Sequence, residues 1–131
     1  MKLVGTLLNI IPNVKNLNKR TYPRAVLEKA VAEYKERYID TGTAYGELYE
    51  GNSSDIVNLS KTTHRITDLR VADDAVIVEA NLLKTPMGML LEDIISPTPI
   101  FISRALASMD KDNIVQDDPT FISIDIEKPN A

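Results

Sequence analysis

Residues 23–39 read PRAVLEKAVAEYKERYI, and this stretch carries the strongest structural pattern in the chain. Its apolar side chains recur at steps of three and four residues, which places them on one stripe of a helix. The stripe consists of Val26, Leu27, Ala30, Val31, Tyr34 and Tyr38. Pro23 suits a first helical turn, which needs no amide donor there, and Gly42 supplies a stop signal. We therefore predict one long helix over about 23–39, with its stripe in the core.

Short apolar runs on both sides of this helix predict β-strands. They cover residues 2–11, 44–48, 64–71, 75–83, 100–103 and 121–127. In the last run, Ile122, Ile124 and Ile126 alternate and are expected on one face. Asp73 and Asp74 indicate a hairpin turn, and 51–55 has turn chemistry. A short helix is expected over 89–95 and an acidic loop over 109–119. This order predicts an α+β fold, a mostly antiparallel β-sheet or barrel-like domain with one long and one short helix.

Length and composition limit the classes of protein that the chain can belong to. Its 131 residues fit a single domain, which we assign to 1–131, and its 44% hydrophobic residues are typical of a globular protein. There is no cysteine and one histidine, so thiolate metal sites, cysteine nucleophiles and sites with several imidazoles are excluded. We expect no metal and no cofactor. The net charge of -4 argues against a nucleic-acid partner.

The apolar stretches are far shorter than the roughly 20 residues of a membrane span. The N-terminal run contains Gly5 and Asn9 and meets Pro12, so it reads as a strand rather than a signal peptide. We expect an intracellular soluble protein with no membrane partner.

The order of several short motifs carries more information than any one of them. They are Asn16-Leu17-Asn18-Lys19-Arg20-Thr21-Tyr22-Pro23, then LEKAV at 27–31, GEL at 46–48, TPMG at 85–88, SRALAS at 103–108, and Ile124-Asp125-Ile126. In this order they resemble the prohead core proteases of tailed phages, serine proteases that cleave scaffold and capsid precursors inside the immature head. The resemblance runs from about Val14 to the C-terminus. It implies a fold similar to the herpesvirus capsid maturation protease, assemblin.

The chain departs from this family where the family's catalytic residues lie. The family typically has Gly-Glu-Leu-x-His-Pro with a catalytic histidine, whereas this chain places Glu50 at that position. The family's nucleophile segment reads Gly-Val-Ser-Ser-Arg-Gly-Leu-Gly-Ser, and alignment on the arginine puts Ile102 at the attacking serine and Ser103 at the second. Two loop glycines become Ala105 and Ala107. Only the acidic position near the C-terminus is kept, as Asp125.

These departures predict a retained fold without its chemistry. Isoleucine has no attacking atom, and an exposed glutamate with a pKa of about 4.3 is a weak base at neutral pH. The leading hypothesis is a non-catalytic structural protein of a tailed-phage virion: a capsid decoration, cement or head-associated protein. The expected partners are capsid or other head proteins, with a homo-oligomer also possible. The expected location is the virion capsid, assembled in the host cytoplasm.

Two alternatives remain open at this stage. One is an active prohead protease with Ser103 as nucleophile, His64 as base and Asp125 as the residue that orients the base. The other is a scaffold-like or dimerising module that regulates a protease encoded elsewhere.

Each of these residues also has an interpretation that involves no catalysis. Ser103 reads as a serine at a strand end, and His64 as a structural or surface histidine. Arg104 has two interpretations, a residue that faced an oxyanion in an ancestral protease or a member of a salt bridge that contributes little if exposed. Glu50 and Asp125 read as solvated carboxylates. The basic loop over 13–20 reads as a solvated loop, with a partner site as the alternative.

Overall fold

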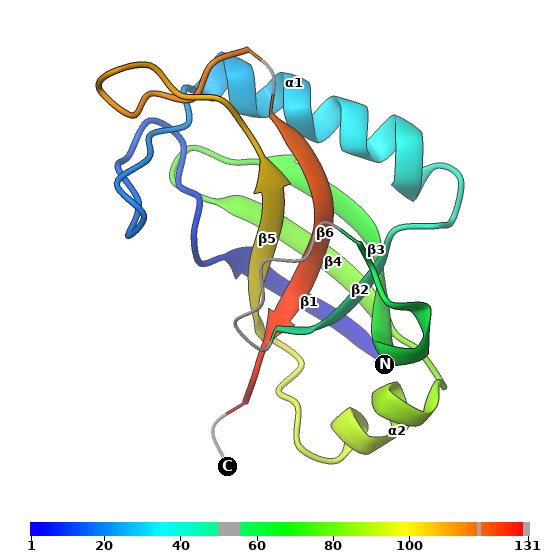
Figure 1. Cartoon of the computed structure of the whole chain (residues 1–131). Helices are drawn as coiled ribbons and strands as arrows, with labels where there is room; N and C mark the ends of the chain where they lie inside the picture. The colour runs from blue at the N-terminus through cyan, green and yellow to red at the C-terminus, as the bar shows by residue number, and fades with distance from the viewer. Residues whose placement is uncertain (50–55, 118, 130–131) are drawn as a thin grey trace.

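The computed structural model describes residues 1–49, 56–117 and 119–129, and these form a closed six-stranded barrel in the order β1-β4-β3-β2-β6-β5 (Figure 1). The strands are β1 (Lys2–Leu7), β2 (Tyr45–Tyr49), β3 (Thr62–Val71), β4 (Val76–Leu82), β5 (Ile100–Leu106) and β6 (Thr120–Glu127). The helical elements are α1 (Arg24–Tyr34), a π-helical turn η1 (Lys35–Ile39), a 3₁₀ turn η2 (Leu59–Lys61) and α2 (Pro86–Glu92). The predicted α+β fold with a barrel-like sheet and two helices is confirmed.

Two short parallel contacts close the barrel. Four strand pairs are antiparallel, including the β3–β4 hairpin over the predicted turn at Asp73 and Asp74. The remaining two pairs are parallel and involve two register positions each, β1 with β5 and β2 with β6. Closure pairs each strand on both sides, which protects edges that would otherwise pair with other chains.

The long predicted helix is confirmed, and it lies along one end of the barrel with α2 at the other (Figure 1). Leu27, Ala30, Val31 and Tyr34 are buried, as the stripe predicts. Pro23 is the N-cap residue, and the predicted C-terminal part of the helix is the π-helical turn η1. Neither α1 nor α2, the helices of the described residues, is long and apolar enough to cross a membrane.

Predicted boundaries of three elements are clearly wrong. The strand predicted over 100–103 extends to Leu106. The first strand ends at Leu7 rather than residue 11, although Ile10 is only 1% exposed, because an irregular buried segment has the same apolar pattern as a strand. The short helix begins at Pro86 rather than residue 89 and ends at Glu92. Its start is set by Thr85, whose hydroxyl accepts a hydrogen bond from the Gly88 amide at 3.0 Å.

The predicted alternation along the last strand is also wrong at one position. Ile124 and Ile126 are fully buried, but Phe121 rather than Ile122 belongs to the core. The register between β5 and β6 shifts between Arg104 and Ala105, so that Ala105 pairs with Phe121. A bulge adds one residue to one strand, and this reverses the side to which the residues beyond it point.

Candidate functional site

Strands β5 and β6 position most of the predicted site residues. Three consecutive residues of β5 pair with three of β6: Ile102 with Asp125, Ser103 with Ile124, and Arg104 with Ser123. Antiparallel partners share a face, so Ser103 lies on the side of the core residue Ile124. Ile102 and Arg104 lie on the opposite side of the sheet with Asp125. The alternation of the strand thus separates Ser103 from Asp125.

A cleft of about 300 Å³ runs between β5 and the loop that precedes α1. It is lined by Leu8, Asn9, Asn16, Leu17, Asn18, Arg20, Tyr22, Tyr49, Ile102, Ser103, Arg104, Ala105, Leu106 and Ile122. The cleft therefore brings together the motif at 16–22 and the segment aligned with the family's nucleophile. Ile102, which the sequence alignment predicts at the position of the attacking serine, lines this cleft and is 8% exposed.

Ser103 is held by a single side chain, Asn9. The Ser103 hydroxyl and the Ser103 amide both donate to Asn9 Oδ1 at 3.2 Å, and Asn9 Nδ2 donates to the Ser103 carbonyl at 3.1 Å. The Asn9 carboxamide thereby continues the hydrogen bonding of β1 along β5 after the parallel contact ends. Ser103 lies within β5 rather than at its end, because the strand extends to Leu106. It is 7% exposed.

His64 is completely buried inside the barrel. Its Nε2 lies 2.8 Å from the Ile124 carbonyl and its Nδ1 lies 2.7 Å from the Thr63 hydroxyl. A carbonyl oxygen only accepts, so Nε2 carries the proton and Nδ1 accepts from Thr63. Burial lowers the pKa of His64 from 6.5 to about 4, although the hydrogen bond with Ile124 acts in the opposite direction. The imidazole is therefore neutral at pH 7, and its basic nitrogen is already occupied.

Gly46 of the Gly-Glu-Leu motif makes room for this histidine. A Cβ atom on Gly46 would lie 2.3 Å from His64 Nε2 and 2.3 Å from the Ile124 carbonyl oxygen. Real Cβ atoms essentially never approach other atoms so closely. The glycine is thus required by the packing of β2 against the His64 ring.

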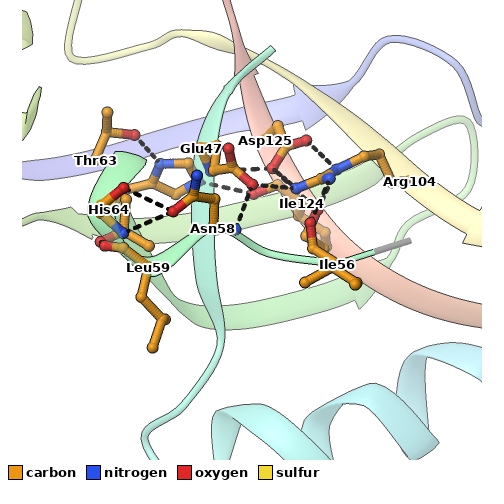
Figure 2. A network of polar contacts seen from close by, with 12 residues as sticks. Glu47, Ile56, Asn58, Leu59, Thr63, His64, Arg104, Ile124 and Asp125 are labelled. Carbon is orange, nitrogen blue, oxygen red and sulfur yellow. Dashed lines mark hydrogen bonds and ion pairs between the residues drawn. The ribbon is translucent and has the colours of Figure 1, made fainter. Parts of the chain in front are cut away.

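A buried ionic network surrounds Arg104 on the other side of the sheet (Figure 2). Arg104 Nε lies 2.7 Å from Asp125 Oδ2, and Nη2 lies 2.9 Å from Glu47 Oε2. Asp125 Oδ1 also accepts from the Glu47 amide and from the Ser123 hydroxyl, each at 3.0 Å. None of the three charged side chains is more than 9% exposed. Of the two interpretations of Arg104, the structure shows the salt bridge, and it is buried rather than exposed. The prediction that Asp125 is a solvated carboxylate is wrong, because its side chain is 2% exposed.

This network also fixes the chain before η2. Arg104 Nη1 donates to the Ile56 carbonyl at 3.2 Å, and Glu47 Oε2 accepts from the Asn58 amide at 3.0 Å (Figure 2). One guanidinium faces two carboxylates, so the ionised cluster carries one net negative charge. Burial raises the pKa of Asp125, while the Glu47 amide, Arg104 and Ser123 act to lower it. Burial acts to lower the pKa of Arg104, but Asp125 and Glu47 outweigh it, and the net shift is upward.

Each residue of the alternative triad has hydrogen-bond partners outside the triad. Among the described residues, no hydrogen bond joins any two of Ser103, His64 and Asp125: Ser103 bonds to Asn9, His64 to Thr63 and Ile124, and Asp125 to the Arg104 cluster. Glu50, the residue at the family's base position, lies outside the described residues.

Sequence analysis missed four polar residues that shape this region: Asn9, Glu47, Thr63 and Ser123. Glu47 and Ser123 lie in strands whose charged or polar character would normally indicate solvent exposure. Arg104 on β5 pairs with the Glu47 carboxylate and donates to the Ser123 hydroxyl, and these contacts depend on the barrel register.

The fold is a closed six-stranded barrel in which the Arg104 segment of β5 lies beside a cleft. The sequence profile described as prohead core protein serine protease matches residues 4–122, so the chain belongs to that family.

Among solved structures, the fold is similar to the bacteriophage T4 capsid assembly protease, gp21, with a TM-score of 0.81 and 27% sequence identity. The match covers 96% of this chain and 80% of that chain. No curated protein sequence matches. The resemblance drawn from the ordered motifs is confirmed.

Proposed function

We propose that this chain is a catalytically silent member of the prohead protease family that acts as a structural protein of a tailed-phage head. The observation that carries the proposal is Ile102. It lines the cleft beside β5 at the position aligned with the attacking serine, and it has no atom able to attack a carbonyl.

The state of the remaining hydroxyl and imidazole supports the same conclusion. A serine nucleophile needs a base within hydrogen-bond reach, and that base needs a free lone pair. Ser103 donates to Asn9, whose amide oxygen is not a base at neutral pH. His64 accepts from Thr63 through its one basic nitrogen, and both residues are fully buried. A substrate cannot reach Thr63 or His64 without opening the barrel.

The proposed role rests on the family and on the integrity of the scaffold. The similar T4 protein is a capsid assembly protease, and a relative without chemistry retains the shape that docks onto head proteins. We propose that this chain binds capsid or other head proteins during assembly and stays with the virion as a decoration, cement or internal head protein.

Cleavage and location test this function separately. Purified protein is incubated with the scaffold and major capsid proteins of its own phage, and cleavage is followed by gel and intact mass. We expect no cleavage above buffer alone, and we expect the chain in purified mature virions by quantitative mass spectrometry. Cleavage that is abolished by Ser103→Ala would contradict the proposal that the chain is catalytically silent. Absence of the chain from mature virions would contradict the structural role. Presence in proheads followed by loss on maturation would favour a regulatory module.

A further inference from the structure

The loop before α1 combines positive charge with exposed aliphatic side chains. Although the chain has a net charge of -4, residues 1–27 contain no Asp or Glu and carry five Lys or Arg. Lys2 pairs with Glu79 and Arg24 with Glu28. No described carboxylate forms an ion pair with Lys15, Lys19 or Arg20. Arg20 forms a side-chain hydrogen bond with Tyr22, and Lys15 and Lys19 are available for a partner.

The same loop exposes aliphatic side chains beside these cations. Leu8 is 45% exposed, Val14 49% and Leu17 88%, and with Ile11 and Lys15 they line a groove of about 220 Å³. This groove shares Leu8, Asn9, Asn16 and Leu17 with the larger cleft beside β5. A leucine exposed to this degree at the tip of a loop gains most by transfer into an apolar partner surface.

The loop is held in one conformation by its own hydrogen bonds. Asn16 Oδ1 accepts from the Arg20 amide at 2.9 Å, and Asn16 Nδ2 donates to the Asn9 carbonyl at 2.8 Å. The Asn16 amide donates to the Arg20 carbonyl at 2.8 Å, and Thr21 donates to the Asn113 carbonyl at 3.0 Å. A loop ordered before binding loses little conformational entropy when a partner docks.

We infer that this basic, aliphatic face, formed by Leu8, Ile11, Val14, Lys15, Leu17 and Lys19, docks an acidic peptide segment with apolar side chains from a partner protein. Charge complementarity selects the acidic character, and the groove selects the apolar side chains. Another exposed aliphatic group, Met89, Leu90 and Ile94 near α2, lacks this signature because Glu92 and Asp93 lie within it. The identity of the partner as a head protein rests on the proposed function. The preference for an acidic, apolar segment does not depend on it.

Nucleic acid fits the same face less well. The groove has no aromatic side chain for base stacking, its unpaired cations are few, and the whole chain is acidic. A protein segment uses both the cations and the aliphatic side chains.

Fluorescence anisotropy with a defined probe tests this inference on the full chain. The probe is the labelled peptide Ser-Gly-Leu-Glu-Glu-Ile-Asp-Glu-Leu-Ser-Gly. Two comparison peptides replace its acids with lysine or its apolar residues with serine. We expect binding of the probe alone, weakened at least tenfold by the double change Lys15→Glu/Lys19→Glu and several-fold by Leu17→Ser. The matched controls Lys84→Glu/Lys128→Glu and Met89→Ser should bind as the unaltered chain does.

Three results overturn the inference. They are no binding of the acidic probe, binding of the lysine peptide as tight as that of the acidic probe, or losses of affinity in the control variants equal to those in the loop variants. Tighter binding of a 20-nucleotide single-stranded DNA, lost in the same loop variants, would reassign the face to nucleic acid. Proteolytic activity at Ser103 would end the proposed function and leave this result unaffected, so the two failures are distinguishable.

Discussion

At the scale of single residues, the sole histidine shows how one buried group links stability to pH. His64 is fully buried, and its pKa is lowered to about 4 by burial. In the unfolded chain its pKa returns to about 6.5. Between these values the unfolded state binds a proton that the folded state does not, so stability falls as the pH falls below 6.5 and is fully present above it.

We therefore expect the free energy of unfolding to be about 2 kcal/mol lower at pH 5 than at pH 7 through His64 alone. Urea unfolding across this range measures the change. Because His64 is the only histidine, its ring signals in NMR are unambiguous and should titrate near pH 4. A ring that titrates near 6.5 in the folded protein would contradict its burial. In His64→Gln, the fall between pH 7 and pH 5 should be smaller by that amount.

Gly46 gives a second prediction at this scale. Gly46→Ala places a methyl group against the His64 ring and the Ile124 carbonyl, and overpacking against backbone should cost about 3 kcal/mol. Gly42→Ala is the matched control: Gly42 has φ of 72° with open space around it, so the cost there comes from backbone conformation and should be about 1 kcal/mol. Equal losses for the two variants in urea unfolding would argue against the close packing of β2 on His64.

At the scale of elements, the charged cluster between β2, β5 and β6 is the main polar link of the barrel. Removing Arg104 leaves Glu47 and Asp125 facing each other in the interior, whereas neutralising one acid leaves a balanced pair. Removing Arg104 is therefore expected to destabilise the protein more than neutralising one acid, because the cluster has one excess negative charge.

Arg104→Met should therefore cost about 3–5 kcal/mol, the range for breaking a buried ion pair from one side. Asp125→Asn keeps an oxygen for the Glu47 amide but turns an NH2 group toward the Arg104 Nε donor, so it should cost less than Arg104→Met, about 1–3 kcal/mol. Thermal unfolding of both variants and of the double variant measures their coupling. A greater loss of stability in Asp125→Asn than in Arg104→Met would contradict a cluster with one excess negative charge.

The elements also show which structural features local patterns can specify. The α1 stripe and the β3–β4 hairpin follow from residues within a few positions of each other, and both were predictable. The bulge between β5 and β6 depends on a partner strand, so Ile122 was assigned to the wrong face. Burial of Glu47 and Arg104 likewise depends on register across strands distant in sequence. From sequence alone, Glu and Arg side chains are expected in solvent, because they are almost never fully buried unless they are paired.

At the scale of the whole molecule, the closed barrel has the family fold, while Ser103, His64 and Asp125 each bond to other residues. Barrel closure through two short parallel contacts was not predictable from periodicity, because it involves only two register positions per pair. The ordered motifs identified the family because they report on the whole fold. Asn16 joins the loop to Asn9, which in turn holds β5 at Ser103.

A hydroxyl introduced at residue 102 should not by itself produce proteolytic activity. Ile102→Ser places an oxygen in the cleft, but the only imidazole stays sealed behind Thr63 and Ile124. We expect Ile102→Ser to remain without measurable cleavage of a fluorogenic casein substrate. Activity in this variant would mean that a base is present in the cleft, and Glu50→Gln would then test whether that residue is the base.

Labelling with a fluorophosphonate, read by intact mass, is the most direct test of the central claim that the prohead protease framework persists here without its chemistry. We expect no adduct on the native chain at pH 7 and 8, under conditions that fully label an active serine protease in the same tube. A single adduct at Ser103, lost in Ser103→Ala, would contradict it.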